Sequence, residues 1–301
     1  MQFKSIPVTF TKEIIQVTGL QAKQISIKCA SDFFPCVVYS TSFEEAKLVA
    51  NIKSGVIEKL KETNNSASIK FSFILPASSE RVAFLVPVRV VGHAPYNNSS
   101  DMSTITMQFA QRPPDDLIEI VGRVIEANLN AAKRKDEIIQ INAESLRKLK
   151  YAGKEVGITV QGVPRRCILR DISFSGARVI VLGISKMLIN KPGSIKFEFT
   201  DPAESYEING TFIGGDAVTD RKDMVVLDLR YDEQHLPMTY KVRLNEYLTT
   251  IRKLPQAAQS TAAAAHETAS AVLPTAPNAA VPPLTPASSA SDPPASKPAV
   301  T

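Results

Sequence analysis

Apolar and polar residues alternate in two separate groups of short segments, and this pattern constrains the fold more than any other feature of the chain. Side chains of a β-strand point alternately to its two faces, so such alternation predicts strands with one buried face. The first group lies in residues 1–111 and consists of Ile25–Cys29, Ile69–Phe73, Val82–Val86 and Ile105–Phe109. The second group lies in residues 136–254 and consists of Ile139–Ile141, Val156–Val160, Cys167–Leu169, Val179–Val181, Ile195–Phe199, Tyr206–Ile208 and Val225–Leu229. The sequence therefore predicts a mainly β chain with two antiparallel, β-barrel-like domains.

A helical linker is predicted between the two groups of strands. The segment Arg112–Asp116 contains two consecutive prolines, which cannot continue a strand ladder, and two aspartates, which suit the positive end of a helix. Apolar residues in Leu117–Leu129 then recur at helical spacing. We therefore expect an interdomain helix and basic linker over residues 112–135. Basic residues at its end complement the helix dipole, which is an alternative to a ligand-binding role for them.

Two further helices are expected, one in each domain. Ser42 is followed three residues later by Glu45, as in a capping box, which predicts a helix running towards Leu60. An apolar stripe over Tyr240–Ile251 predicts a C-terminal helix that lies across the second barrel. Turns between the short strands of the second domain are expected at Lys191–Gly193, Asn209–Gly210 and Gly214–Gly215.

The composition changes after Leu254 to alanine, proline, serine and threonine, without any aromatic residue or glycine. Such a segment cannot bury enough apolar surface to offset the entropy lost on ordering. A disordered tail is therefore predicted over residues 255–301. The expected organisation is an accessory domain over 1–111, the linker over 112–135, the second barrel with its closing helix over 136–254, and the tail.

Composition argues against several classes of protein. The net charge of +5 is spread among acidic residues, which is too weak a signal for DNA or RNA binding. No apolar stretch reaches the roughly 18 residues that span a bilayer, and the N-terminus lacks a signal-peptide pattern. We therefore expect a cytoplasmic protein without a membrane span.

The residues that most often carry metal or catalytic chemistry are few and scattered. The cysteines, which form neither a disulfide framework nor a zinc spacing and are expected to be reduced, are Cys29, Cys36 and Cys167. The histidines are His93, His235 and His266. Because the chain also lacks a nucleophile elbow, a P-loop and a zinc-protease motif, we expect neither enzymatic activity nor a cofactor.

The most specific local signal is the segment Asp171–Gly176, which reads as a tight polar turn between two strands. A carboxylate at Asp171 can accept two N–H bonds, and a hydroxyl at Ser173 can donate or accept. Gly176 lets another backbone or a ligand approach closely. Taken alone, aspartate and serine could simply cap their own turn.

This segment fits the D/N-x-S-x-x-G signature of PilZ domains, and the chain resembles that family of bacterial β-barrel receptors for cyclic di-GMP. The family also carries an R-x-x-x-R element on the linker that enters the barrel. Arg134 matches the first arginine, but Ile138 stands at the second. The literal R-x-x-x-R at Arg166–Arg170 is discounted, because it adjoins the turn inside a strand.

The resemblance implies the roles of the site residues. Arg134 would clamp a phosphate or guanine, Asp171 and Ser173 would bind a guanine edge, and Gly176 would keep the barrel surface clear. Compensation for the arginine missing at Ile138 is expected from among Lys133, Lys135, Arg165 and Arg166.

The first domain resembles, more loosely, the barrel-like domains that accompany PilZ in flagellar-brake proteins and in spirochaete receptors. The implied function is a cyclic di-GMP receptor that rearranges its domains on ligand binding and regulates motility through a protein partner, such as a flagellar motor or signalling component. The alternative is a degenerate PilZ adaptor that binds a protein and ignores the nucleotide, which the isoleucine at Ile138 would favour.

Overall fold

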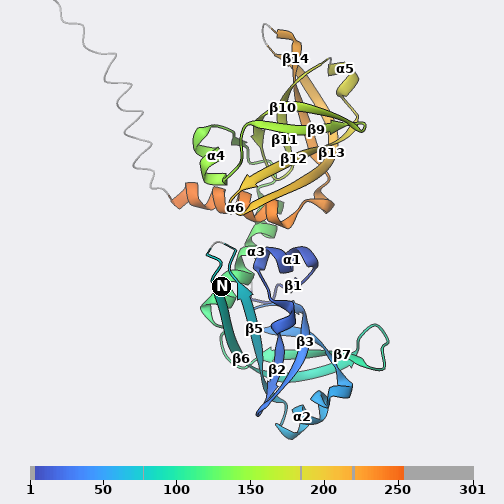
Figure 1. The fold of residues 1–301 in the computed structure, drawn as a ribbon, viewed down its shortest axis with the longest axis vertical. Helices are drawn as coiled ribbons and strands as arrows, with labels where there is room; N and C mark the ends of the chain where they lie inside the picture. Colours follow the sequence, from blue (N-terminus) through green and yellow to red (C-terminus); the bar gives the residue numbers. More distant parts are fainter. Residues whose placement is uncertain (1–3, 77, 184, 219–220, 254–301) are drawn as a thin grey trace, which may run out of the picture. The chain divides into compact units, whose positions relative to one another are not determined.

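The computed structural model describes residues 4–76, 78–183, 185–218 and 221–253, which contain two closed β-barrels (Figure 1). The strands of the first barrel are β1 (Val8–Thr9), β2 (Ser26–Cys29), β3 (Asp32–Thr41), β4 (Glu45–Asn51), β5 (Ser66–Ile74), β6 (Arg81–Pro95) and β7 (Met102–Phe109). They pair in the order β1-β3-β2-β5-β6-β7-β4, and an added β3–β4 pairing closes six of them into a ring. All of these pairings are antiparallel, so the mainly β, barrel-like expectation for this half of the chain is confirmed.

Alternation in the sequence is what fills the first barrel. Ile69, Phe71 and Phe73 on β5 are fully buried, as are Ile105 and Met107 on β7. Residues at every second position of a strand share one face, so these side chains meet inside the ring. The outward positions between them are polar or half-exposed.

The helix expected from Ser42 to Leu60 is wrong in its first half. The Ser42 hydroxyl accepts hydrogen bonds from the backbone N–H groups of Glu44 and Glu45, both at 3.1 Å, but the turn that it stabilises opens strand β4. Ala46 and Leu48 are fully buried at alternate positions, and β4 pairs on both sides with β3 and β7. Pairing on two sides therefore overrides the local capping signal, and the helix α2 begins only at Val56 and ends at Glu62.

The predicted linker helix is α3 (Asp115–Lys133). Its buried face, from Leu117 to Ala127, joins the core of the first barrel. Two acidic residues lie in its first turn and Lys133 in its last, as the helix dipole favours. The helix therefore ends directly before the segment that leads into the second barrel.

The second barrel has the same closed antiparallel design. Its strands are β8 (Ile139–Gln140), β9 (Glu155–Val160), β10 (Val163–Ile172), β11 (Gly176–Leu182), β12 (Pro192–Thr200), β13 (Ala203–Val218) and β14 (Arg221–Tyr231). They pair in the order β11-β14-β13-β12-β9-β10-β8, and the hairpin pairing of β10 with β11 closes the ring. Its core includes Val179, Ile195, Phe212 and Leu227, all fully buried.

The three turns expected in the second barrel are wrong, and Pro192 and Gly193 of the first one already belong to strand β12. Asn209–Gly210 and Gly214–Gly215 both lie inside β13. A Cβ at Gly210 would lie 2.1 Å from the carbonyl oxygen of Arg230, so this glycine permits two strands to approach closely. The register shifts between Phe212 and Gly214, where β13 contains a bulge. Glycine in a sequence marks both turns and close approaches, and here the second use applies.

The remaining helices are short, apart from the C-terminal one. They are α1 (Lys12–Thr18), α4 (Ala143–Leu149), α5 (Ser185–Leu188) and α6 (Met238–Lys253). The predicted C-terminal helix is thus confirmed as α6. Tyr240 and Leu244 are fully buried in the core of the second barrel, whereas Met238 and Val242 belong to the core of the first. Helix α6 therefore takes part in both cores.

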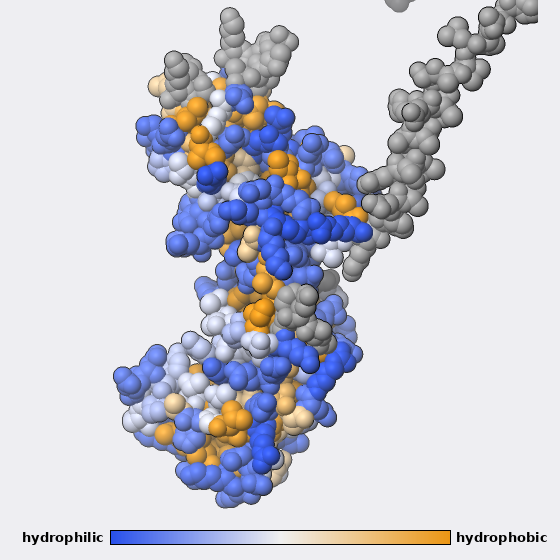
Figure 2. Space-filling view, turned by 180° about the vertical axis from the view of Figure 1, so that it is seen from behind, coloured by the Kyte–Doolittle hydropathy of each residue, from blue (hydrophilic) through white to orange (hydrophobic). Residues whose placement is uncertain are grey.

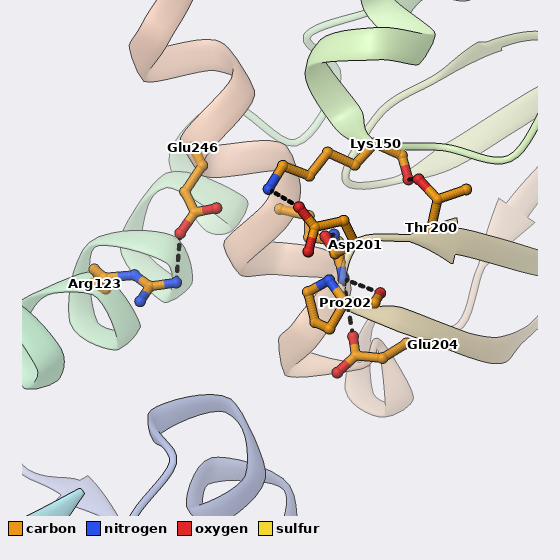
Figure 3. Close-up of polar contacts among 8 residues, drawn as sticks. Arg123, Lys150, Thr200, Asp201, Pro202, Glu204 and Glu246 are labelled. Atoms are coloured by element: carbon orange, nitrogen blue, oxygen red, sulfur yellow. Dashed lines mark hydrogen bonds and ion pairs between the residues drawn. The ribbon is translucent and has the colours of Figure 1, made fainter. Parts of the chain in front are cut away.

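Polar contacts also connect α6 with α3. Arg123 donates to Glu246 (Figure 3). Asn130 donates to Asn245 at 2.7 Å. Of the four residues, Asn245 is buried and the Arg123–Glu246 ion pair is largely exposed. An exposed ion pair contributes little to stability, about 0–1 kcal/mol, so the apolar packing of α6 matters more than this bridge.

The three cysteines are all buried and unpaired. Burial raises the pKa of the Cys36 thiol and that of the Cys167 thiol to about 12, and it also raises the pKa of Cys29.

The exposed hydrophobic residues on the face seen in Figure 2 form small groups bordered by hydrophilic ones. No helix among the described residues is long and apolar enough to cross a membrane. The predicted tail and His266 lie outside the described residues.

We expect Leu244→Ala to lower the free energy of unfolding by about 2–5 kcal/mol, because it opens a cavity where α6 meets the second barrel. Thr250→Ala on the same helix is the control, since Thr250 is exposed and only its hydroxyl bonds to Glu246. Urea unfolding of both variants measures the difference. Equal stabilities would show that α6 is not part of the cooperative core.

Candidate functional site

The polar turn between β10 and β11 is closed by its own serine. The Ser173 backbone N–H donates to the Gly176 carbonyl at 2.8 Å. The Ser173 hydroxyl oxygen accepts from the backbone N–H groups of Ser175 and Gly176 at 3.2 and 3.1 Å. Ser173 is only 7% exposed, so its hydroxyl serves mainly to hold the turn.

Asp171 is paired with an arginine across the hairpin. The register of β10 and β11 sets Asp171 opposite Arg178, whose Nε lies 2.9 and 2.8 Å from the two carboxylate oxygens. Arg178 Nη2 lies 2.8 Å from Oδ2. These hydrogen bonds to Asp171 raise the pKa of the Arg178 guanidinium above its ordinary value. Asp171 is 4% exposed, and Arg178 compensates the negative charge of its carboxylate and holds it in one orientation.

Gly176 is required by the close approach of two strands. A Cβ at this position would lie 2.4 Å from the carbonyl oxygen of Leu229 on β14. The Gly176 backbone and the Leu229 carbonyl are both fixed in a closed barrel, so neither can shift easily. The absence of a side chain at Gly176 also leaves the barrel surface above it open.

The segment that leads into the second barrel is tied to this turn. The backbone carbonyl of Lys135 accepts from the Ser175 N–H at 2.9 Å, and the Asp136 carboxylate accepts from the Ser175 hydroxyl at 2.8 Å. Lys135 itself lies 3.5 Å from Glu233 in an exposed ion pair. The linker and the turn therefore form one connected structure.

Arg134 lies on that segment, and its guanidinium is engaged by Glu137. Its Nε and Nη2 donate to the two Glu137 carboxylate oxygens at 2.5 and 2.7 Å. This bidentate bond lowers the pKa of Glu137 below its ordinary value, and Arg252 of α6 lies 3.6 Å from the same carboxylate. The Arg134 side chain is 13% exposed, and its Nε and Nη2 are both occupied by Glu137. A ligand would have to displace Glu137 to form two hydrogen bonds with this guanidinium.

A pocket of about 320 Å³ lies over the turn. Its walls come from the segment that leads into the second barrel, the turn and three neighbouring strands. Its lining residues include Asp136, Ile138, Asp171, Ser173, Gly176, Arg178, Ile213, Asp228 and Arg230. Ile138 is 53% exposed at this pocket. Three of the residues expected from the sequence, all from the D/N-x-S-x-x-G segment, therefore come together here.

The expected basic residues are distributed differently. Arg134 and Lys135 are close in sequence to Asp136 on the pocket wall, but neither lines the pocket. Arg165 and Arg166 line a separate pocket of about 420 Å³ with Lys196 and Glu207. Lys133 ends α3.

Two arginines in the pocket were not expected from the sequence. Arg178 could have been inferred, because a tight hairpin centred between Phe174 and Ser175 sets positions 171 and 178 opposite each other. Arg230 could not, because its pairing with Gly176 joins strands that are distant in sequence.

The described residues contain no group of three or more histidine, cysteine, aspartate or glutamate side chains that could hold a metal ion. His93 lies on β6, and His235, in a short 3₁₀ turn, is hydrogen-bonded to Asp232 at 2.7 Å. The polar and charged side chains that line the pocket can form hydrogen bonds and ion pairs with a bound molecule.

Comparison with known proteins identifies the family. A family model described as the PilZN3 domain matches residues 1–128. A protein of Treponema denticola named "Cyclic di-GMP binding protein" is 37% identical over 252 residues, which cover 83% of this chain and 80% of that one. The chain belongs to the PilZ-domain family. The resemblance inferred from the Asp171–Gly176 signature is thereby confirmed.

Solved structures related to this PilZ protein are more distant. The Borreliella burgdorferi PlzA protein, crystallised in complex with c-di-GMP, is 23% identical with a TM-score of 0.36, over 82% of this chain and 95% of that one. Escherichia coli YcgR, also in complex with c-di-GMP, is 12% identical with a TM-score of 0.24, over 89% of this chain and 96% of that one.

Gly176→Ala is expected to lower the free energy of unfolding of this PilZ protein by about 1–3 kcal/mol, because its Cβ would overlap the Leu229 carbonyl. Gly157→Ala on β9 is the matched control, since a Cβ there meets nothing within 4 Å. Thermal and urea unfolding of both variants provide the measurement. If the two alanines were equally tolerated, the close approach of β11 to β14 would not be a constraint.

Proposed function

We propose that this chain is a non-enzymatic receptor for cyclic di-GMP. The observation that carries the proposal is that one pocket combines the PilZ signature residues Asp171, Ser173 and Gly176 with Asp136 and Ile138 of the segment that leads into the second barrel. The Treponema denticola relative, named as a cyclic di-GMP binding protein, supports the choice of ligand.

The groups around the pocket suit a guanine dinucleotide. Guanine presents N1–H and N2–H donors, which carboxylates accept well, and Asp136, Asp171 and Asp228 line the pocket. The phosphates require cations, and a guanidinium can bond to them through two parallel N–H groups. We assign this role to Arg134, whose guanidinium would release Glu137 and bind a phosphate instead.

Helix α6 supplies a route from the pocket to the first barrel. The Tyr240 hydroxyl donates to the backbone carbonyl of Ser173 at 2.8 Å, and both groups are buried. Met238 and Val242 on the same helix pack into the first core. A ligand that moves the Ser173 turn would therefore shift α6, and differential affinity for the two positions would drive the rearrangement of the domains.

The proposed biological role is regulation of motility or a related behaviour in the cytoplasm, through a protein partner such as a flagellar motor or signalling component. The partner would recognise the ligand-bound arrangement of the domains. The ligand is the signal in this scheme, so no cofactor or catalysed reaction is required.

A degenerate PilZ adaptor that binds a protein without the nucleotide is the second candidate. The exposed isoleucines Ile138 and Ile213 in the pocket favour it, because apolar side chains at the rim suit a protein contact better than a phosphate. Tight binding of cyclic di-GMP by the unaltered chain would exclude this candidate.

Titration calorimetry of the full chain with cyclic di-GMP tests the receptor proposal. We expect micromolar binding by the parent and about a ten- to hundredfold loss in Asp171→Asn and in Arg134→Ala, since each removes a charge-assisted contact. Asp101→Asn is the control, because Asp101 is an exposed partner of Lys53 in the first barrel. Parental affinity in both site variants would place the ligand elsewhere.

Tyr240→Phe tests the coupling route. It removes the hydroxyl that holds the Ser173 carbonyl but keeps the ring in the core, so calorimetry should still detect binding. The ligand-induced change in small-angle scattering should become smaller than in the parent. Tyr247→Phe on α6 is the control, because no hydrogen bond of the Tyr247 hydroxyl occurs within the described residues. A parental scattering change in Tyr240→Phe would rule out this route.

A further inference from the structure

Position 138 leaves the pocket without a cation at the point where the linker enters the barrel. Ile138 lines the pocket and exposes 53% of its surface, so an apolar side chain faces the space that a second linker arginine would occupy. A dinucleotide with two phosphates needs more than the single guanidinium of Arg134. The missing charge can come from another element of the same pocket.

The strand pair β11–β14 provides such a group. Their register sets Gly176 opposite Arg230 and Arg178 opposite Asp228. Residues directly opposite in an antiparallel pair share one face, and alternate residues of a strand return to that face. All four residues accordingly line the pocket, two positions apart on adjacent strands.

Gly176 makes room for the Arg230 side chain. The Arg230 Cα lies 3.6 Å from the position that a Cβ on Gly176 would take. Because its cross-strand neighbour has no side chain, Arg230 can extend its stem over the turn without competition. No side chain can fill this space, because a Cβ at Gly176 would overlap the carbonyl oxygen of Leu229.

Arg230 differs from the other arginines at the site in having no side-chain partner among the residues that the structure describes. Arg178 is held by Asp171, and Arg134 is held by Glu137. Arg230 is exposed and forms no ion pair or side-chain hydrogen bond with any residue that the structure describes. Binding an anion through Arg230 therefore breaks no existing bond, whereas recruiting either of the other two requires an exchange of partners.

We propose that Arg230 is a ligand-contacting residue whose guanidinium binds a phosphate of cyclic di-GMP in place of the arginine absent at position 138. This inference rests on the proposed receptor function. Asp136 and Asp228 remain available to accept guanine N–H groups in the same pocket. Their negative charge also means that phosphate needs a close guanidinium here, since the pocket as a whole is not cationic.

Calorimetry of the full chain with cyclic di-GMP, with thermal unfolding as a check of folding, tests the assignment. We expect Arg230→Ala to weaken binding by about ten- to a hundredfold. Arg230→Lys should recover only part of the affinity, because lysine has no planar fork. The matched control is Arg147→Ala, which removes an exposed arginine of helix α4 that does not line the pocket.

A rescue variant separates a contact role from a structural one. Adding Ile138→Arg to Arg230→Ala should restore affinity to near that of the parent, since it returns the guanidinium to the other side of the pocket. Binding by the parent with unchanged affinity in Arg230→Ala would overturn the role of Arg230 and leave the receptor function intact. Absence of binding by the parent would overturn both.

Discussion

The hairpin between β10 and β11 is the constraint on which the second barrel and its pocket depend. It closes the ring of six strands, so none of those strands keeps an open edge. The same pairing fixes the register that sets Asp171 opposite Arg178. With β11 fixed, its neighbour β14 must approach at Gly176 closely enough to exclude any side chain there. The β10–β11 hairpin therefore both closes the second barrel and fixes the geometry of the pocket.

Much of the fold follows from local patterns in the sequence. Period-2 alternation located both barrels, and the helical spacing after Pro114 located α3. The prediction failed for Glu45–Asn51, where the capping signal predicts a helix but the segment is a strand that pairs on both sides. It also failed at Gly210, where glycine allows two strands to approach closely. Both errors concern contacts between segments that are distant along the chain.

The signature turn was the most predictable part of the site, because its chemistry is contained in six consecutive residues. What the sequence could not supply is the state of the charged groups. Arg134 is engaged by Glu137 and Asp171 by Arg178, and only the folded chain reveals these pairings. The Asp171–Arg178 pair therefore holds two side chains of the pocket, and the Arg134–Glu137 pair lies on the segment beside it. Such pairing keeps the side chains in place and makes binding largely an exchange of equivalent bonds.

The buried cysteines have a practical consequence. Maleimide reagents attack the thiolate, and the raised pKa of Cys36 and Cys167, together with burial of all three side chains, keeps the native sulfur atoms protonated and shielded. A cysteine introduced on the surface can therefore be labelled selectively in the otherwise native chain. Fluorophores or spin labels can then be attached to each barrel for distance measurements, without first replacing the native cysteines.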